Sequence, residues 1–458
     1  MTNTTNMTNR APTPRLDAAR AELISKTPRC HEISHARAEI LNSGLAANVE
    51  MPHPIFLESG QGSRVIDADG NSYIDTSVGF GLHMLGHRHP VVHDAIVARA
   101  DKGWMFGIHS TTQMALAQLL QEASPCAERV VFCNTGTEAT FYAIRAARAF
   151  TGRETIALFD GAYHGAHDYG MVLADPSSTP DDLHTLPMGR GIPKSIQSLV
   201  RMLPYRHAAA FAAIRKYKDE LALVMIEGVQ SSNPQSGIAD FLGELKEVCR
   251  ACAVPLMFDE VITGFRIDYA GAQGYFGVTP DLATYGKVLG GGMPVGAIAG
   301  RADLMEVFTG LAGGRGIFSG GTFSGNPMTM AAGTAAVGHL KAHPEIYPYV
   351  NGQGDRLAGA INTFCSQRQM PVHMKNVGSM FHMFFQRNVV ESARDIRVTY
   401  GAAQSAFYLH ALNRGVLVPG TQRAFLSAAH SPADVDALID VFQQSLVDTQ
   451  ADGLFDNY

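Results

Sequence analysis

The chain has 458 residues, of which 46% are hydrophobic and 17% charged, a composition typical of a soluble globular protein with room for two or three domains. Its net charge of −6 argues against nucleic-acid binding, and no apolar run approaches the ~18 residues that a membrane span needs. Residues 1–14 are polar, so we expect a flexible tail without an export signal. With only six cysteines, the chain is predicted to be cytoplasmic.

The segment 15–75 is predicted to begin with a helix and to end in a β-hairpin. The hairpin strands are Ser63–Asp67 and Asn71–Asp75, and Ala68–Gly70 supplies the turn between them. We assign this segment to a small domain.

From 76 to 330, short apolar strands alternate with helical patterns, as in a doubly wound, mostly parallel sheet. The expected strands include Arg129–Cys133, Thr155–Phe159, Leu221–Ile226, Pro255–Phe258 and Val295–Ala299. Within this region, Asp168–Pro193 is long and rich in Pro, Gly, Ser and Asp, which suggests a lid near a pocket. From 331 to 458, helices flank strand-like Val377–Phe384 and Ala424–Ser427, so we expect a small α+β domain.

Two strand-like runs end on charged residues that suit a cofactor site. Asp259 follows Pro255–Phe258, and Lys287 ends a second short run just before three glycines. Parallel sheets present their chemistry at the carboxyl ends of their strands. A lysine there can form a Schiff base with an aldehyde cofactor, and a carboxylate can keep a pyridinium nitrogen protonated. Lys287 taken singly would more often be a solvated loop residue, but its pairing with Asp259 favours the cofactor site.

A helix N-terminus after the strand Arg129–Cys133 is a candidate phosphate site. Thr135 and Glu138 have capping-box spacing, so the helix is predicted to begin at Gly136 and Thr137 with free amide groups. Those amides and the positive end of the helix dipole attract anions. An ordinary capped helix is the alternative.

Two further loops carry weaker signals. The glycine-rich stretch Gly320–Asn326 contains Thr322 and again enters a helix. Tyr163 follows the strand Thr155–Phe159, where its ring can stack on a planar cofactor. A tyrosine of the core or of a lid is an equal alternative.

Two patterns that suggest metal ligands have better explanations. Cys249 and Cys252 lie in a helical pattern, and no second cysteine pair has zinc-site spacing. His87 and His89 come before Pro90, as in a turn that precedes a helix. We therefore predict no metal site.

Four motifs occur in order along the chain, namely Asn134–Ala139, Asp259–Arg266, Gly271–Gly277 and Thr322–Pro327. Together they resemble the class III (subgroup II) pyridoxal-phosphate aminotransferases of fold type I, and most closely the glutamate-1-semialdehyde aminomutase branch. The match runs from about Val65 to the C-terminal helix. The resemblance implies a large doubly wound domain, a small α+β domain built from the N- and C-terminal segments, and a homodimer with shared active sites.

The resemblance also implies roles for single residues. Lys287 would be the Schiff-base lysine, and Asp259 would pair with the pyridine nitrogen of the cofactor. The other assignments are Val261 and Tyr163 for the two ring faces, Gly136 and Thr137 for the phosphate, Thr322 for the phosphate bound by the partner subunit, Ser232 for the phenolic oxygen (with Gln230 and Asn233 as further candidates), and Phe80 and Tyr163 for the substrate pocket.

Two departures from the aminomutases bear on the substrate. Those enzymes hold the substrate carboxylate with an arginine in the segment that matches Gly44–Met51, but this sequence has no arginine between Arg37 and Arg64. Near the C-terminus, Pro419–Ser427 lacks the glutamate of the aminomutases and contains Arg423. A guanidinium group suits carboxylate binding, so we expect this role for Arg423, with a surface arginine as the alternative.

Several stretches resemble the amine-transferring modules of natural-product assembly lines, among them Gly191–Ser195, Met202–Tyr205 and Ala283–Lys287. We therefore expect an enzyme that moves an amino group from an amino-acid donor to a ketone or aldehyde, either free or bound to a carrier protein. The resemblance implies a ping-pong scheme in which the cofactor alternates between pyridoxal and pyridoxamine phosphate. The alternatives are intramolecular transfer by an aminomutase, a decarboxylase or racemase of the same fold, and a catalytically silent cofactor-binding protein.

Overall fold

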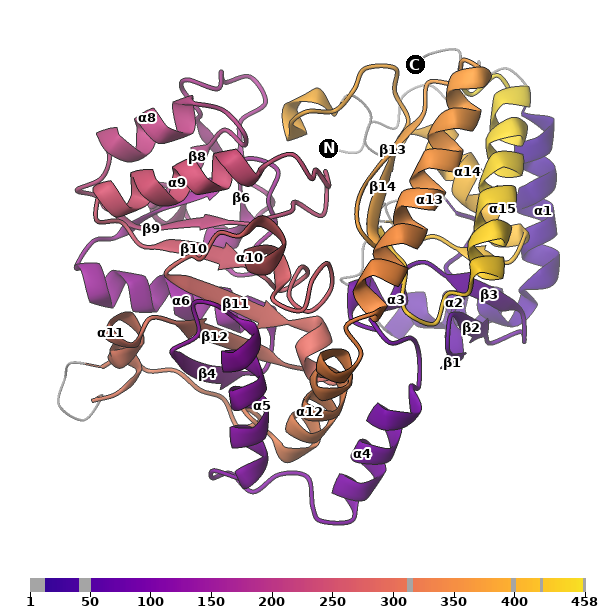
Figure 1. The fold of residues 1–458 in the computed structure, drawn as a ribbon. Helices are drawn as coiled ribbons and strands as arrows, with labels where there is room; N and C mark the ends of the chain where they lie inside the picture. The colour runs from indigo at the N-terminus through magenta and orange to yellow at the C-terminus, as the bar shows by residue number, and fades with distance from the viewer. Residues whose placement is uncertain (1–12, 41–50, 311–315, 397–400, 421–422, 456–458) are drawn as a thin grey trace.

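The computed structural model describes residues 13–40, 51–310, 316–396, 401–420 and 423–455 (Figure 1). The tail expected at 1–14 therefore lies outside the described residues up to residue 12. The helices are α1 (Pro14–Lys26), α2 (Pro28–Ile40), α3 (Val78–Gly81), α4 (Pro90–Ala100), α5 (Thr111–Ala123), α6 (Gly136–Thr151), α7 (Lys194–Gln197), α8 (Ala209–Lys216), α9 (Ala239–Ala251), α10 (Gly271–Phe276), α11 (Ala302–Met305), α12 (Pro327–Ala342), α13 (Ile346–Gln367), α14 (Ala402–Asn413) and α15 (Pro432–Ala451), with 3₁₀ turns η1 (Asp168–Met171), η2 (Lys287–Gly290), η3 (Glu306–Phe308) and η5 (Ala393–Asp395). The strands are β1 (Leu57–Gln61), β2 (Arg64–Asp67), β3 (Ser72–Asp75), β4 (Arg129–Cys133), β5 (Thr155–Phe159), β6 (Val172–Ala174), β7 (Thr185–Pro187), β8 (Val200–Leu203), β9 (Leu221–Ile226), β10 (Leu256–Asp259), β11 (Leu282–Gly286), β12 (Gly296–Gly300), β13 (His373–Val377), β14 (Met380–Phe384), β15 (Val416–Leu417) and β16 (Ala424–Phe425).

A seven-stranded sheet forms the centre of the large domain, in the order β4-β12-β11-β10-β9-β5-β8. All neighbouring pairs are parallel except the two that β12 makes with β11 and with β4. The strand expected over Val295–Ala299 thus lies one residue later, at Gly296–Gly300, and is the one antiparallel strand of this sheet. The mostly parallel α/β architecture expected from the sequence is confirmed.

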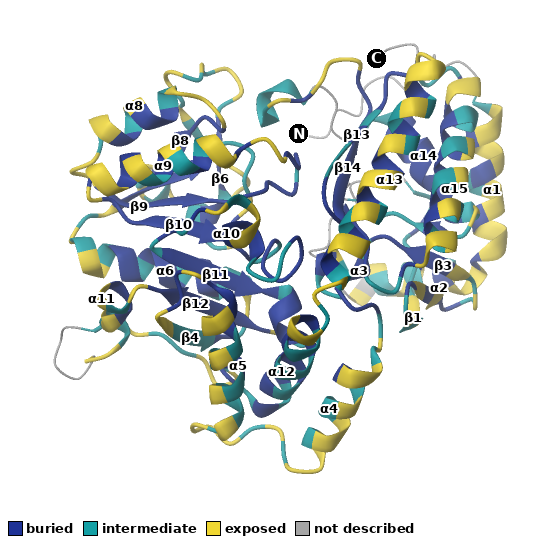
Figure 2. Cartoon of the chain, in the orientation of Figure 1, coloured by how far each residue is buried: buried dark blue, intermediate teal, exposed yellow. Residues whose placement is uncertain are grey.

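Both faces of this sheet are covered, and strands β5, β9, β10, β11 and β12 are buried at every position (Figure 2). In β5, Ile156 and Leu158 pack in the cluster that contains α6, whereas Ala157 and Phe159 pack in the cluster that contains α8 and α9. Successive side chains of a strand point to opposite faces, so a strand covered on both faces must be apolar at each position. This explains the unbroken apolar runs of the sequence.

The small domain combines segments from both ends of the chain. The short strand β15 pairs in parallel with β3, so that Val416 lies opposite Ile74. Helix α1 packs against α14 and α15, and Figure 1 shows this group on the right of the large domain. Helix α12 crosses the boundary expected at residue 330 and packs against α4 and α5.

One strand predicted for the small domain is too long, because its continuous apolar pattern hides a turn. The sequence predicts one strand over Val377–Phe384, whereas the structure has an antiparallel hairpin in which β13 pairs with β14. Gly378 makes the turn with a φ of 54°, a left-handed conformation that glycine adopts without steric cost. The residues on either side of the turn are buried, so hydrophobicity alone does not reveal it.

The long segment expected as a lid contains a short hairpin. Within Asp168–Pro193, β6 pairs with β7 in an antiparallel two-stranded sheet.

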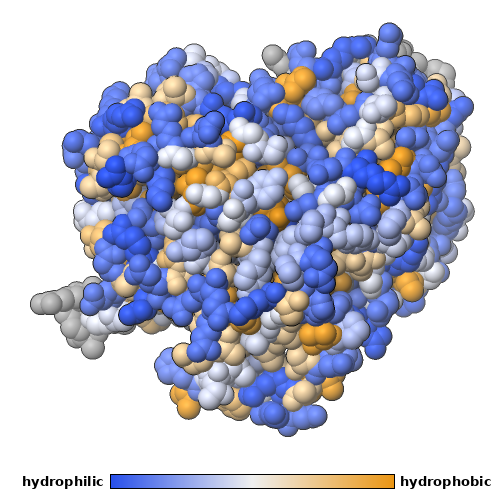
Figure 3. Space-filling view, in the orientation of Figure 1, coloured by the Kyte–Doolittle hydropathy of each residue, from blue (hydrophilic) through white to orange (hydrophobic). Residues whose placement is uncertain are grey.

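On the face drawn in Figure 3, polar and apolar side chains are interspersed. Within the described part of the chain, no helix is long and apolar enough to cross a membrane.

Arg266 joins the two domains through a fully buried guanidinium group. Its nitrogens donate to the carbonyl oxygens of Gly81 and Leu426 at 3.0 Å each, and to the Ser379 hydroxyl at 3.3 Å. Since Ser379 and Leu426 belong to the small domain, these bonds connect the two domains.

Replacing Arg266 by Met is expected to destabilise the fold by several kcal/mol. Each buried carbonyl left without a donor costs about 1–3 kcal/mol. Denaturant unfolding of Arg266→Met and of Arg250→Met, whose side chain is exposed, measures the difference. Equal unfolding midpoints for the two variants would show that the buried bonds contribute nothing to stability.

Candidate active site

The carboxyl ends of the six parallel strands lie along one edge of the large sheet, and a cavity of about 410 Å³ opens there at the ends of β4, β5, β9, β10 and β11. Polar residues lie just after four of these strands, and one polar residue is the last residue of the fifth. This is expected where an open α/β sheet binds a ligand. The residues that line this cavity include Thr135, Gly136, Thr137, Tyr163, His164, Glu227, Asp259, Val261 and Lys287.

Asp259 ends β10 with a buried carboxylate held by three donors. One oxygen accepts from the Val261 amide at 3.1 Å and from the Thr284 hydroxyl at 3.2 Å. The other lies 2.8 Å from Nδ1 of His164, and Nε2 of that imidazole is buried without a partner. The sequence pattern indicates no role for His164, although this residue follows the candidate stacking residue Tyr163. The contact joins residues 95 positions apart, which no local pattern reveals.

Lys287 follows β11 directly and begins η2. Its φ of 45° is a left-handed conformation that costs a residue other than glycine about 1–3 kcal/mol. Burial in the cavity lowers the pKa of its amine below the ordinary value, while Asp259 and Glu227 act against this shift. A buried amine with a lowered pKa is more often unprotonated, which is the nucleophilic form.

Helix α6 points its N-terminus at the same cavity. The predicted capping box is confirmed, because Thr135 Oγ1 accepts from the Glu138 amide at 3.0 Å and the Glu138 carboxylate accepts from the Thr135 amide at 3.2 Å. Gly136 lies so close to Val261 that a Cβ atom there would come within 2.8 Å of the valine methyl group. Only glycine fits, and the amides of the first turn remain open to an anion.

Two charged residues, Arg423 and Glu227, lie beside Tyr163 at the cavity. The Tyr163 ring lines it, and Cζ of Arg423 lies 5.6 Å from the centroid of that ring. Glu227 accepts from the Tyr163 amide at 2.7 Å. Burial raises the pKa of Glu227, and the positive charge of Arg423 is among the influences that oppose the rise. Glu227 is not among the site residues expected from the sequence; its position directly after β9 is the signal that could have identified it.

The family model described as "Aminotransferase class-III" matches residues 45–446. The chain belongs to the class-III aminotransferase family. The expected family and fold type are thereby confirmed, and the chain is an enzyme of this family.

Known proteins similar to this class-III aminotransferase carry two kinds of names. "Glutamate-1-semialdehyde 2,1-aminomutase 2" of Exiguobacterium sp. is 39% identical, over 87% of this chain and 91% of that protein. Among solved structures, an omega-transaminase from Sphaerobacter thermophilus superposes with a TM-score of 0.85 at 31% identity, covering 92% of this chain and 98% of the other. A beta-phenylalanine aminotransferase from Variovorax paradoxus gives 0.84 at 29%, covering 95% and 98%. The curated relatives favour the aminomutase alternative over a natural-product aminotransferase.

Four expected site residues of this class-III aminotransferase, Ser232, Phe80, Thr322 and Arg423, do not line the cavity of the single chain. The Ser232 hydroxyl donates to the carbonyl oxygen of Gly161 at 2.8 Å, so Glu227 rather than Ser232 reaches the cavity from the segment after β9. The Phe80 side chain is exposed, as is Thr322 on a turn before α12. Gln230 and Asn233, the other candidates for the phenolic oxygen, are buried outside the lining.

Proposed function

We propose that the chain is a pyridoxal-phosphate-dependent aminotransferase that takes the amino group of a carboxylate-bearing donor and passes it to a carbonyl acceptor. The main support for this proposal is the position of Arg423. It lies beside Tyr163, and its positive charge lowers the pKa of both Lys287 and Glu227. The chain therefore has a candidate carboxylate anchor at the cavity mouth, although its segment Gly44–Met51 lacks the arginine expected of an aminomutase.

The residues of the cavity fit this cofactor. A volume of about 410 Å³ lies within the range of small-ligand pockets. The close approach of Gly136 to Val261 leaves a narrow cradle that a Cβ atom would fill. The Asp259 carboxylate is buried at the cavity floor, where a protonated ring nitrogen would neutralise its charge.

The cofactor, when bound, supplies an aldehyde to attach the donor amine and a protonated ring that accepts electrons from the donor's alpha carbon. Lys287 would hold the aldehyde and, once its amine is free, carry the proton from the alpha carbon. Asp259 would keep the ring nitrogen protonated, and His164 would hold the Asp259 carboxylate in place. The hydrogen bond from Nδ1 orients the imidazole against the carboxylate.

The remaining residues would orient the cofactor and the substrate. The first-turn amides of α6, at Gly136 and Thr137, would bind the phosphate. Val261 and Tyr163 would contact the two faces of the ring. Arg423 would pair with the donor carboxylate, because an ionised carboxylate entering a partly dry pocket is unfavourable without a partner.

Arg423→Ala is expected to slow the half-reaction with a carboxylate-bearing donor by raising its activation free energy by ~2–5 kcal/mol. This is the range for removing one partner of a buried charge pair. An amine donor without a carboxylate should be affected far less. Single-turnover rates with matched donors, such as alanine and isopropylamine, measure the difference. Arg423→Lys serves as the control, because it keeps the charge but loses the planar fork. Equal losses with both donors would show that Arg423 has a structural role.

Intramolecular transfer is the second candidate function, and the names of the curated relatives favour it. The two functions differ in their need for a donor. Incubation with glutamate 1-semialdehyde alone should yield stoichiometric product in an aminomutase, with no keto acid released. A transaminase should instead need an amino donor and release one keto acid per amine transferred. Robust conversion of the semialdehyde alone would overturn the primary proposal.

The resemblance to natural-product modules supports a larger ketone or aldehyde as acceptor, free or attached to a carrier protein. A panel of acceptors with and without a phosphopantetheine arm tests this part separately. Faster turnover of the arm-linked form would support a carrier-bound acceptor.

We further propose a homodimer with shared sites. Large apolar side chains are exposed beside the turn that holds Thr322, among them Ile108 (79% exposed) and Phe323 (62%). The side chain of Gln113 donates to the Gly325 carbonyl at 3.0 Å, which brings the segments before α5 and before α12 together. Large apolar side chains that stay exposed near one another are typical of a protein interface.

Mixed dimers of Thr322→Ala and Lys287→Ala protomers are expected to recover one working site. If Thr322 serves the phosphate of the partner subunit, one site of the hybrid carries both defects and the other carries neither. Activity of co-expressed, doubly tagged hybrids measures the recovery, and each homodimer is the control. If the activity of the hybrids is no higher than the mean of the two homodimers, each of their sites carries one defect. Each site would then be built from a single chain.

A further inference from the structure

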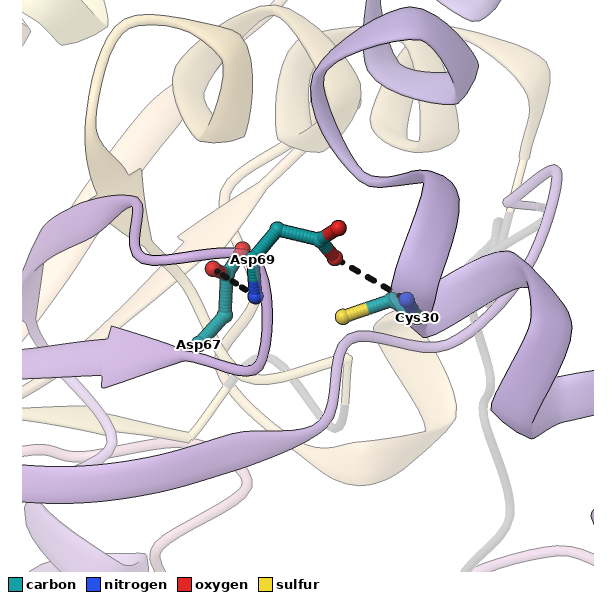
Figure 4. A group of neighbouring side chains, drawn as sticks. All are labelled: Cys30, Asp67 and Asp69. Atoms are coloured by element: carbon teal, nitrogen blue, oxygen red, sulfur yellow. Dashed lines mark hydrogen bonds between the residues drawn. The ribbon is translucent and has the colours of Figure 1, made fainter.

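A cluster of Cys30, Asp67 and Asp69 in the small domain has a structural explanation. Among the residues that the structure describes, their side-chain oxygen and sulfur atoms lie within 4.8 Å of one another (Figure 4). Asp69 accepts from the amides of Arg29 and Cys30 in the first turn of α2, at 2.7 and 2.9 Å. Asp67 accepts from the Asp69 amide at 3.0 Å. Burial raises the pKa of the Cys30 thiol to about 11, which keeps it protonated. The cluster therefore joins α2 to the turn between β2 and β3.

A segment of the small domain reaches across to the large domain. We call residues 390–395 the strap; it follows β14, includes η5 and lies between the two domains in Figure 1. The carboxylate of Asp395 accepts from the amides of Glu391 and Ser392 at 3.0 and 2.7 Å, so the strap is an internally bonded turn. The Glu391 carbonyl accepts from the side-chain amide of Gln235 at 2.7 Å. The strap is thus held against the segment that follows β9.

Arg394 of the strap contacts two separate segments of the large domain. Its Nε atom forms an ion pair with Oδ2 of Asp160 at 3.0 Å. Nη2 donates to the Asp175 carbonyl at 3.3 Å and to the Ser178 hydroxyl at 3.2 Å, and Nη1 donates to the Ser178 carbonyl. Asp160 directly follows β5, whereas Asp175 and Ser178 lie between β6 and β7. One planar guanidinium fork therefore joins three parts of the chain.

The pair of Arg394 and Asp160 is shielded from water. Only 20% of the Arg394 side chain and 15% of the Asp160 side chain are exposed. Burial raises the pKa of Asp160, and the positive charge of Arg394 opposes the rise. A largely buried carboxylate is unfavourable without a partner, so loss of the arginine would leave Asp160 to protonate or to move toward water.

Asp160 begins the loop that carries Tyr163. Next to it, Gly161 has a φ of 86°, and a Cβ atom there would come within 2.6 Å of the Ala393 methyl group of the strap. From the segment after β9, the side chain of Gln230 donates to the Asp160 carbonyl at 2.8 Å. The loop is therefore held between the strap and that segment, with Tyr163 lining the cavity. A displacement of the strap would move the loop and its tyrosine.

We propose that Arg394 is a positioning residue that sets the orientation of the Tyr163 ring through Asp160 and holds the segment 168–193 against the small domain. The role of the Tyr163 ring rests on the proposed function, whereas the contacts of Arg394 do not. Because one side chain serves both segments, contact between the domains and alignment of the ring are coupled. The charge of Arg394 serves Asp160, and its fork serves the segment 168–193.

Hydrogen–deuterium exchange of the full-length enzyme as purified tests these contacts without reference to activity. In Arg394→Gln, peptides that cover 160–163 and 175–178 should both exchange at least about tenfold faster, because both segments open more easily. Arg394→Lys keeps the charge but lacks the planar fork. It should protect 160–163 like the wild type and leave 175–178 exchanging as fast as in Arg394→Gln. Asp160→Asn should give the opposite pattern, and it carries the test of the loop if Arg394→Gln does not fold.

Arg206→Gln is the matched control, because Arg206 pairs with Glu391 of the same strap at 3.3 Å. Among the described residues, the side-chain bonds of Arg206 go to Glu391 and Gln235 rather than to Asp160. Both peptides should keep their wild-type exchange in this variant. Unchanged exchange in Arg394→Gln would overturn the proposal, and so would equal acceleration in Arg206→Gln, which would mean that any loosening of the strap has the same effect.

The effect on the Tyr163 ring is measured in the cofactor-loaded enzyme. Arg394→Gln should slow the amino-donor half-reaction by about 10–100-fold, since a misplacement of about 1 Å can cost that much. It should also change the visible circular dichroism of the bound cofactor, and Arg394→Lys should restore both. A slower reaction with unchanged dichroism would contradict a role through ring orientation. Failure of the wild type to bind the cofactor would refute the proposed function and the role of Tyr163, while the exchange pattern would still decide the contacts of Arg394.

Discussion

Lys287→Ala is expected to abolish turnover while leaving the fold intact. Lys287 is the lysine that lines the cavity, and burial lowers the pKa of its amine toward the reactive, unprotonated form. Loss of a general acid–base group alone costs ~10²–10⁴-fold in rate, and loss of the covalent attachment adds to this. Steady-state rates, the absorbance of the enzyme-bound cofactor and circular dichroism measure activity, attachment and folding separately.

Lys287→Arg is the matched control, because it keeps the positive charge but cannot attach the aldehyde. It should be as inactive as the alanine variant. Added methylamine should partly restore the alanine variant, since a small amine can enter the space that the side chain leaves. A Lys287→Ala enzyme that retains more than about a thousandth of the wild-type rate would contradict the assignment.

Asp259→Asn is expected to lower kcat by about 10²–10³-fold, the usual cost of removing one electrostatic contact to a developing charge. The amide has the size of the carboxylate but lacks the charge that would hold the ring nitrogen protonated. His164 would also lose its charged acceptor, which lies at 2.8 Å in the wild type. Single-turnover kinetics with a saturating amino donor measure the chemical step apart from binding.

Thr284→Val separates the charge of Asp259 from its positioning. This variant removes the hydroxyl that donates to the Asp259 carboxylate at 3.2 Å but leaves the carboxylate ionised. A hydrogen bond to a charged group contributes about 1.5–3 kcal/mol, so the rate should fall by no more than about 150-fold. Similar rates for Asp259→Asn and Thr284→Val would mean that the charge of Asp259 is not required.

The local features of the site follow from the sequence alone. The capping box of Thr135 and Glu138 and the start of α6 at Gly136 agree with the sequence-based prediction. Lys287 and Asp259 were predicted at strand ends, and both lie at the carboxyl edge of the sheet. Such features depend on a few consecutive residues, because helix capping, strand burial and the approach of a glycine are short-range effects.

Contacts between distant segments were decided only by the tertiary structure. The Asp259–His164 pair, the buried Arg266 and the reach of Glu227 into the cavity each depend on how several layers pack together. The direction of β12 likewise depends on its neighbours, since an apolar run suits a parallel or an antiparallel strand equally well. The Ser232 side chain does not line the cavity because its hydroxyl donates to the carbonyl oxygen of Gly161. Local sequence sets the dihedral preferences and burial of each segment, whereas the pairing of side chains across the cavity is set by the relative positions of strands that are far apart in the chain.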